Sequence, residues 1–255
     1  MRISKYANDE PLIKATEKEL PKIKKSKSSE GIITVGDEPY DDEELQYPKT
    51  SDIYLSSLEG NDWLNDNIIN DYCDLLGRKY KDVMIFTTFF SEMFFTRNRG
   101  YSIASRYCRS RDIFEKRLVI FPIVHHSHWF TAILNFDKKE IKMLDPYLKE
   151  NNLIEINDHM NWLEKLEHNF LALYFYERGY SDWISLNKSV CIPPEIPKQD
   201  DGSNCGVFLL EFCRCLCSRQ SFNFSSKDMP NSRARIKREL QNEKLEPILF
   251  MVNET

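Results

Sequence analysis

The sequence predicts an α+β fold in which a central mixed sheet is flanked by helices. An apolar, β-branched run at 118–124 predicts a buried strand, and the segments 129–136 and 140–145 predict two more strands joined by a polar turn. An amphipathic pattern over 63–76 and a mostly apolar stretch over 206–218 predict helices. Helices and strands in this mixture are typical of an α+β domain.

Two regions of different composition divide the chain. Residues 1–48 carry separate Lys-rich and acidic runs with little to bury, so we predict a disordered arm there. Residues 49–255 hold the predicted helices and strands and should form one folded domain. The whole chain has 255 residues, of which 41% are hydrophobic and 13% aromatic, and this is enough for a hydrophobic core.

The predicted elements follow one another from Trp63 onward. The first helix begins after Asn61-Asp62, which can cap it, and a second helical stretch covers 89–108. In the first strand Pro122 has to lie at an edge or near the end, because proline donates no backbone hydrogen bond. A further helix is expected over 156–173, and a loop-rich, proline-containing region follows Tyr180.

The last two predicted helices differ in how they should be buried. Over 206–218 the polar residues Glu211, Arg214 and Ser218 form a single stripe, so this helix should be mostly buried. The final helix, 232–246, is rich in charge, and we expect a solvated face rather than a binding surface.

Charge and hydrophobicity exclude several classes of protein. The net charge of −5 gives no global attraction to nucleic acid and favours a partner with a basic surface. The chain starts with charged sequence rather than an apolar signal segment, and no apolar run approaches the roughly 20 residues of a membrane span. We therefore expect a soluble intracellular protein without nucleic-acid or membrane partners.

The seven cysteines are expected to be reduced, because their number is odd and no export signal precedes them. Cys213, Cys215 and Cys217 lie close together, but their spacing differs from the C-x2-C pairs of zinc sites. On a helix they would point in different directions, so we expect small buried side chains rather than metal ligands.

Cys205 is the strongest candidate for a catalytic nucleophile. It lies directly before the predicted buried helix, whose N-terminal partial charge favours the reactive thiolate. Gly202 and Gly206 flank it and would let a substrate backbone approach closely. A buried structural role is the usual alternative for a cysteine, but the polar surroundings of Cys205 argue against it.

Histidines supply a candidate general base. His125, His126 and His128 cluster before a predicted strand, and a His-His-x-His cluster can also bind a metal. No cysteine or carboxylate with matching ligand spacing is nearby, so we favour catalysis, with His128 as the base. His159 and His168 fall on a predicted helix and are expected at its surface.

Asp145 and Gln199 complete the candidate site. A hairpin brings Asp145, at the end of the returning strand, near His128, where its carboxylate can orient the ring. The alternative is a turn aspartate before Pro146. The amide of Gln199 can donate to an oxyanion beside the backbone N–H of Cys205. A cysteine, a base, a carboxylate and an amide together indicate a thiol peptidase or isopeptidase.

These motifs resemble the ubiquitin-like-protein protease (Ulp/SENP) family, the SUMO proteases related to adenovirus proteinase. His128-Trp129, Asp145 and 199–206 follow the order of that family, and Trp63-Leu64-Asn65-Asp66 resembles its helix signature. The resemblance covers roughly residues 50–225. It implies a papain-like or adenain-like cysteine protease fold, with a buried helix after the nucleophile.

The resemblance also implies roles for individual residues. Cys205 would be the nucleophile, His128 the base, Asp145 its orienting partner and Gln199 the oxyanion donor. For substrate binding, Trp63 and Trp129 would form a narrow tunnel over a C-terminal Gly-Gly, and Asp66 would pair with an arginine of the modifier. Core packing is the alternative for both tryptophans, and a helix-capping role is the alternative for Asp66.

The activity implied is hydrolysis after the Gly-Gly of SUMO, in precursor processing or deconjugation, by a monomer that needs no cofactor or metal. Two alternatives remain: a protease for another ubiquitin-like modifier or ubiquitin, and a catalytically weak SUMO-binding adaptor. Two positions depart from the family pattern. Asn204 stands where aspartate is common, and Pro146 stands where serine is more usual.

The N-terminal arm carries two weaker signals. The run Ile32-Ile33-Thr34-Val35, between acidic residues, resembles a SUMO-interacting motif, which adds as a strand to a partner's sheet. A chance apolar run or a first strand of the domain is the alternative for Ile32, Ile33 and Val35. The lysines of 22–27 predict nuclear import, and we expect a nuclear protein that can also occur in the cytoplasm.

Overall fold

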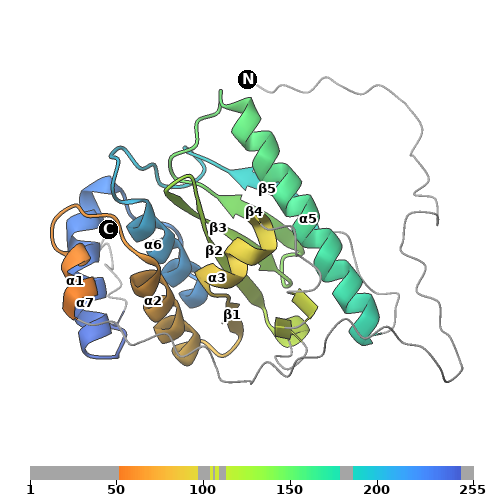
Figure 1. Cartoon of the computed structure of the whole chain (residues 1–255), viewed down its shortest axis with the longest axis horizontal. Helices are drawn as coiled ribbons and strands as arrows, with labels where there is room; N and C mark the ends of the chain where they lie inside the picture. The colour runs from red at the N-terminus through yellow and green to blue at the C-terminus, as the bar shows by residue number, and fades with distance from the viewer. Residues whose placement is uncertain (1–51, 97–103, 106, 109–112, 179–185, 248–255) are drawn as a thin grey trace, which may run out of the picture. The chain divides into compact units, whose positions relative to one another are not determined.

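A computed structural model describes residues 52–96, 104–105, 107–108, 113–178 and 186–247 (Figure 1). Its centre is a mixed sheet with the strand order β1-β2-β3-β4-β5. The strands are β1 (Val83–Ile85), β2 (Leu118–His125), β3 (His128–Asn135), β4 (Glu140–Leu144) and β5 (Asn187–Cys191). The inner pairs β2–β3 and β3–β4 are antiparallel, whereas β1 and β5 run parallel to their neighbours.

The three predicted strands are confirmed within one or two residues. The turn between β3 and β4 covers 136–139, as expected. Pro122 pairs with Thr131 of β3, but β1 pairs only with Leu118, Val119 and Ile120. Pro122 therefore lies beyond the end of β1, where β2 has a strand on one side only, and this agrees with the predicted edge position.

Helices cover both faces of the sheet, so it has two cores. Alternate side chains of the strands point to opposite faces. Leu118, Ile120 and Ile133 belong to the core under α2 (Asp66–Lys79) and α6 (Cys205–Ser218). Val119, Phe121, Phe130 and Leu134 belong to the second core, under α5 (Leu153–Arg178). Figure 1 shows α5 on one side of the sheet and α2 with α6 on the other.

Several helix boundaries differ from the predictions. α2 begins at Asp66, because the side chain of Asn65 caps it by accepting from the backbone N–H of Ile68 at 3.1 Å. The predicted helix over 89–108 is interrupted: α3 covers Thr88–Ser91, and a π-helical turn, η2, follows at Glu92–Thr96. The remaining short helices are α1 (Asp52–Leu55), η1 (Ser56–Leu58), η3 (Ile113–Glu115) and η4 (Ser226–Asp228).

The last helix, α7 (Met229–Gln241), corrects the prediction of a solvated charged helix. Arg233 and Glu239 are buried, and Arg235 is partly buried. The helix ends at Gln241 rather than near residue 246. A solvated face was expected from charge alone, but charged side chains can be buried when each one finds a partner.

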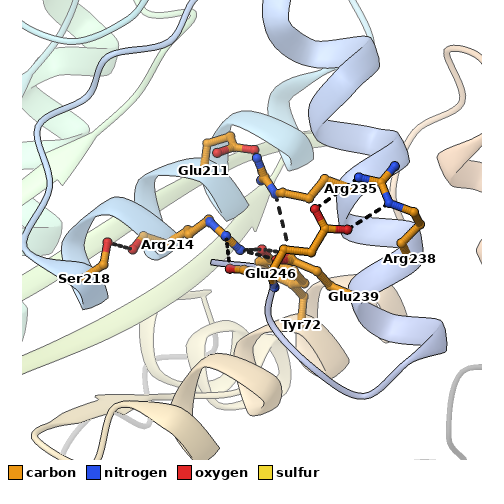
Figure 2. A network of polar contacts seen from close by, with 8 residues as sticks. All are labelled: Tyr72, Glu211, Arg214, Ser218, Arg235, Arg238, Glu239 and Glu246. Atoms are coloured by element: carbon orange, nitrogen blue, oxygen red, sulfur yellow. Dashed lines mark hydrogen bonds and ion pairs between the residues drawn. The ribbon is translucent and has the colours of Figure 1, made fainter. Parts of the chain in front are cut away.

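These partners form the polar network of Figure 2, which joins α7 to α6 and α2. Arg214 donates to Glu239 at 2.5 Å and to the hydroxyl of Tyr72 at 3.0 Å. Tyr72 in turn donates to Glu239 at 2.6 Å, and Arg235 pairs with Glu211. Glu211 and Arg214 of the predicted polar stripe therefore face α7, and their ion pairs fix how α7 packs, whereas the hydroxyl of Ser218 donates to the backbone of its own helix.

Cysteine placement agrees with the prediction of small buried side chains. Cys213 and Cys217 are buried, Cys215 is partly buried, and all three are free thiols.

Within the described ranges, no helix is both long enough and apolar enough to cross a membrane.

Candidate active site

Three elements bring the predicted catalytic residues to one end of the sheet. Cys205 is the first residue of α6, His128 is the first residue of β3, and Asp145 directly follows β4. The register pairs Thr131 with Leu144, so Asp145 reaches the strand end where His128 lies. Asp145 and His128 therefore meet through the predicted hairpin.

Asp145 is fully buried and holds the imidazole of His128. Nε2 of His128 lies 2.8 Å from Oδ1 of Asp145, which also accepts from the backbone N–H groups of Tyr147 at 3.0 Å and Leu148 at 3.2 Å. Burial alone would raise the pKa of Asp145, but the hydrogen bond with His128, the charge of that ring and the backbone N–H of Tyr147 together outweigh burial and lower it. The carboxylate is thus an ionised, fixed acceptor.

His128 lies between this carboxylate and the thiol of Cys205. Burial disfavours the imidazolium, but hydrogen bonding to Asp145 and Cys205 and the charges of both partners together outweigh it, and the pKa of His128 rises to about 10. The side chain of Cys205 is itself almost fully buried. A cationic imidazole beside a cysteine sulfur is the arrangement by which thiol hydrolases activate their nucleophile.

The segment before the nucleophile, residues 200–204, is here called the nucleophile loop. Its turn is organised by Asp201, whose Oδ1 accepts from the backbone N–H groups of Ser203 and Asn204, each at 2.8 Å. The side-chain amide of Asn204 donates to Oδ2 of Asp201 at 2.9 Å. The side chain of Asn204 therefore donates to Asp201 through its amide N–H, and its oxygen stays free to accept from another group. An aspartate at this position has no such donor.

Arg233, from α7, anchors the nucleophile loop from behind. Its buried guanidinium donates to Oδ1 of Asn204 at 2.8 Å and to the backbone oxygens of Ser57 at 2.8 Å, Asp62 at 2.9 Å and Ser203 at 3.3 Å. No sequence motif pointed to Arg233, since its only signal was its place in a charged helix. Its contacts depend on four segments that meet only in the folded protein.

Gln199 is buried close to the nucleophile loop. Its backbone N–H donates to the oxygen of Pro146 at 2.9 Å, and this fixes it beside the segment that follows Asp145. One side-chain N–H donates to the backbone oxygen of Asp201 at 2.8 Å. An amide carries two N–H bonds, so the second one is left for an oxyanion.

The two predicted tunnel tryptophans lie in different surroundings. Trp63 is 57% exposed and donates from Nε1 to the backbone oxygen of Gly202 at 2.9 Å. Trp129 is buried and donates to the backbone oxygen of Leu64 at 3.0 Å. An exposed tryptophan held by one hydrogen bond fits a binding surface better than core packing, whereas Trp129 has a packing role in any case.

The glycines beside Cys205 differ in what they approach. A Cβ at Gly206 would lie 3.0 Å from Cβ of Leu64, so the close approach there is made by the protein itself. Nothing lies within 4 Å of a Cβ at Gly202. The expectation that both glycines make room for substrate is thus corrected for Gly206, which lets the N-terminus of α6 pack against Leu64.

Asp66 is the first residue of α2 and is exposed, while Asn65 takes the capping role. Partial desolvation and, secondarily, the carboxylate of Glu92 raise the pKa of Asp66. An exposed carboxylate that is not the helix cap can meet a cationic partner. The capping alternative is therefore wrong for Asp66.

The other histidines separate into distinct environments. The rings of His125 and His126 lie 3.8 Å apart and do not share a ligand set with His128, and no group of three metal-ligating side chains occurs in the described segments. His168 is exposed, as predicted. The surface prediction for His159 is wrong: this residue is 4% exposed, with Nε2 at 3.5 Å from Oδ2 of Asp145.

Two predictions fall outside the described residues. The SUMO-interacting motif with Ile32, Ile33 and Val35, and the lysines of 22–27, both lie in the range 1–51. The predicted arm of 1–48 stays a prediction for the same reason.

Comparison with known proteins agrees with this geometry. Residues 62–248 match the model of the Ulp1 protease family, C-terminal catalytic domain. Sentrin-specific protease 5 of Mus musculus is 30% identical over 187 residues, which are 73% of this chain and 23% of that protein. A sentrin-specific protease of Caenorhabditis elegans is 31% identical over 199 residues, covering 75% of this chain and 27% of that protein. The chain thus spans about a quarter of the length of these curated relatives.

Solved structures confirm the predicted fold class. The X-ray structure of the C-terminal Ulp1 protease domain in complex with Smt3, the yeast ortholog of SUMO, matches with a TM-score of 0.63 and 20% identity, over 75% of this chain and 82% of that chain. The Ulp1-like SUMO protease catalytic domain of Chaetomium thermophilum matches with a TM-score of 0.55 and 20% identity, over 75% of this chain and 77% of that one. Since the family model covers most of the sequence, residues 62–248, this chain belongs to the Ulp1 protease family.

Proposed function

We propose that this chain is a cysteine protease that cleaves after the C-terminal Gly-Gly of SUMO, in precursor processing, in deconjugation or in both. One observation carries the proposal: Cys205, His128 and Asp145 meet in the order and geometry of a thiol hydrolase. The family membership of the chain and the names of its relatives, sentrin-specific proteases, support SUMO as the modifier.

The reaction follows from the contacts of these side chains. The Cys205 thiolate attacks the carbonyl carbon of the last glycine, and the resulting oxyanion accepts from the Gln199 amide and the backbone N–H of Cys205. The His128 imidazolium then protonates the leaving amine, which departs and leaves a thioester. Finally His128 takes a proton from water, which attacks the thioester and releases the carboxylate product and the thiol.

Selection of Gly-Gly is assigned to Trp63 and Trp129. Flat aromatic walls around the scissile tail exclude residues with side chains, so glycine is selected by exclusion. The exposed position of Trp63, tied to Gly202 of the nucleophile loop, supports this role. The test is Trp63→Ala, which should raise KM for the Gly-Gly tail and relax the exclusion of a Gly-Ala tail.

Recognition of the modifier is assigned in part to Asp66, whose exposed carboxylate would pair with an arginine of SUMO. Asp66→Asn should raise KM and leave kcat unchanged, because the contact is the same in ground and transition states. Asp74→Asn on the same helix is the matched control, since Asp74 is exposed and already paired with Arg78. Equal effects of the two changes would argue against the role of Asp66.

Covalent capture tests the function as a whole. The protein is incubated with SUMO, ubiquitin and other ubiquitin-like modifiers, each carrying a cysteine-reactive C-terminal group, beside a Cys205→Ser control. A Cys205-dependent adduct with SUMO alone supports the proposal. An adduct with a different modifier keeps the mechanism and replaces the substrate, and folded protein that forms no adduct points to a SUMO-binding adaptor.

We further propose two roles for the N-terminal arm. Residues 32–35 would make a second contact with SUMO, and residues 22–27 would act as a nuclear import signal. A second contact raises the effective concentration of the catalytic domain on polymeric SUMO. Replacing Ile32, Ile33 and Val35 with alanine should weaken binding to SUMO chains and leave hydrolysis of monomeric substrate unchanged. Equal affinity for chains after this change would refute the second contact.

A further inference from the structure

Asp145 lies between two imidazole rings, of which the catalytic scheme above uses only one. Oδ1 is 2.8 Å from Nε2 of His128, and Oδ2 is 3.5 Å from Nε2 of His159. Oδ1 also accepts from the backbone N–H groups of Tyr147 and Leu148. Oδ2, by contrast, is buried and has no hydrogen-bond donor among the described residues. Nε2 of His159 likewise has no hydrogen-bond partner among the described residues, so these two buried polar atoms face each other at 3.5 Å.

The hydrogen bonding of His159 fixes its protonation pattern. Nδ1 lies 2.8 Å from the backbone oxygen of Glu155, which can only accept, so Nδ1 carries a proton. In the neutral ring Nε2 would then point a lone pair at the carboxylate oxygen, and two buried acceptors would face each other. A second proton, on Nε2, turns this contact into a charge-assisted hydrogen bond.

The ring of His159 is held in place by its neighbours. Phe130 contacts it edge-on, with ring centroids 4.6 Å apart, and Trp162 lies at 6.1 Å. His125 of β2 interacts electrostatically with His159, and His126, Asp158 and Glu155 act on His125 as well. Asp145 is the acid that contacts Nε2 of His159, and the same carboxylate also holds the imidazolium of His128.

We propose that His159 is a positioning residue for the catalytic base: doubly protonated, it donates from Nε2 to Oδ2 of Asp145 and so holds the carboxylate with Oδ1 toward His128. The four groups Cys205, His128, Asp145 and His159 then alternate in charge, negative, positive, negative, positive. This order leaves the buried carboxylate with a donor on each oxygen, as buried charges require. The inference deepens the proposed function, on which its kinetic consequences rest.

Three variants test the role of His159 in the full chain. His159→Phe keeps a ring but removes the donor, and His159→Gln keeps a donor in the amide without the charge. His168→Phe, on the exposed side of the same helix, is the control. We expect kcat for SUMO cleavage to fall on the order of 10- to 100-fold in His159→Phe, as for other partners that orient a reacting group, and only a few-fold in His159→Gln.

The pH profile separates positioning from a general structural role. Without a donor on Oδ2, Asp145 takes up a proton more readily, and His128 then loses its carboxylate partner. The acid limb of Cys205 alkylation by iodoacetamide should therefore move to higher pH in His159→Phe, while His168→Phe should match the original chain. A folded His159→Phe variant with the original rate and pH profile would overturn the proposal.

Imidazole nitrogen NMR on the unaltered chain keeps the test valid if His159→Phe does not fold. Both nitrogens of His159 should carry protons at pH 7, and a neutral Nδ1–H ring throughout pH 5–8 would overturn the inference. Alkylation and NMR need no SUMO, so they test the role of His159 separately from the proposed substrate. If capture by SUMO fails while His159 is doubly protonated and the acid limb shifts, only the proposed substrate is wrong.

Discussion

Arg233 donates from Nε to Oδ1 of Asn204 at 2.8 Å, and Asn204 is the residue directly before the proposed nucleophile, Cys205. The same guanidinium donates to the backbone oxygen of Asp62, which directly precedes Trp63. One buried cation thus fixes the nucleophile and the exposed tryptophan relative to each other. Asparagine is neutral, so Arg233 forms no ion pair with it. The charge of Arg233 interacts instead with Asp201, with Asp62 and, less strongly, with Cys205.

Arg233→Lys should separate the geometry of this side chain from its charge. Lysine keeps the charge, but one ammonium cannot reach four acceptors in three segments as the planar guanidinium does. We expect the free energy of unfolding to fall by about 2 kcal/mol or more, since buried acceptors lose their donors. Urea denaturation measures this loss, and the rate of capture by the SUMO probe measures the displacement of Cys205.

Arg238→Lys is the matched control, because Arg238 lies on the same helix and is exposed in its pair with Glu246. It should change stability by less than about 0.5 kcal/mol, as expected for a surface site. If the two lysine variants lost similar amounts of stability, the anchoring role of Arg233 would be wrong.

Gly206→Ala should disturb the junction of α6 and Leu64. The added methyl group would lie 3.0 Å from Cβ of Leu64, closer than ordinary contact, and the fixed backbone on both sides leaves little room to adjust. We expect a loss of roughly 1–3 kcal/mol in the free energy of unfolding, typical of overpacking. Adding Leu64→Ala should recover part of the overpacking strain, which a double-mutant cycle measures as coupling.

Gly77→Ala is the control, and here we expect the free energy of unfolding to rise rather than fall. Gly77 lies inside α2, and nothing lies within 4 Å of a Cβ built there. Alanine should therefore stabilise the chain by up to about 1 kcal/mol through its helix propensity. A stabilising effect at both glycines would contradict the close packing described for Gly206.

The part of the site that could be predicted is the part made by local pairing. His128 and Asp145 are joined by a hairpin whose turn residues are readable, and strand register follows from the turn. Cys205 was recognisable because a polar loop changes there into a buried helix. In each case the signal lies within a few residues of the functional side chain.

The remainder depends on packing between distant segments. His159 and Arg233 lie on helices whose polar residues, taken alone, indicate solvent, and they are buried only because α5 covers the sheet and α7 packs on α6. Strand β5 was missed because its sequence, Asn187–Cys191, is polar at its start and acquires its strand form by pairing with β4. Tertiary context, not local propensity, decided these positions.

Gln199→Ala should lower kcat on the order of 10²- to 10³-fold with little change in KM, since an oxyanion donor acts only in the transition state. The alternative is that Gln199 only supports the nucleophile loop through Asp201. Alkylation of Cys205 by iodoacetamide decides between them, because that reaction forms no oxyanion. If hydrolysis slows while alkylation is unchanged, Gln199 is an oxyanion donor. If both reactions slow equally, Gln199 only holds the nucleophile loop in place.

The pH dependence of the reaction should follow the proton on His128. The pKa of His128 is raised from 6.5 to about 10, so the imidazolium that protonates the leaving amine persists through neutral pH. Because the folded pKa lies above the unfolded one, the stability it contributes is fully present below pH 6.5 and is lost as pH rises toward 10. We expect the alkaline limb of kcat/KM, and a fall in the free energy of unfolding, in that upper range.

Asp145→Asn should move this alkaline limb to lower pH. Burial disfavours the imidazolium, and without the carboxylate the pKa of His128 falls, so the general acid is lost at neutral pH. Hydrolysis of an isopeptide bond at pH 7.5 should slow by roughly 10⁴-fold, as when asparagine replaces the aspartate of a catalytic triad. Alkylation of Cys205 above pH 10 needs no proton from His128 and should change far less. If isopeptide hydrolysis kept its alkaline limb in Asp145→Asn, the proton would have to come from a group other than His128.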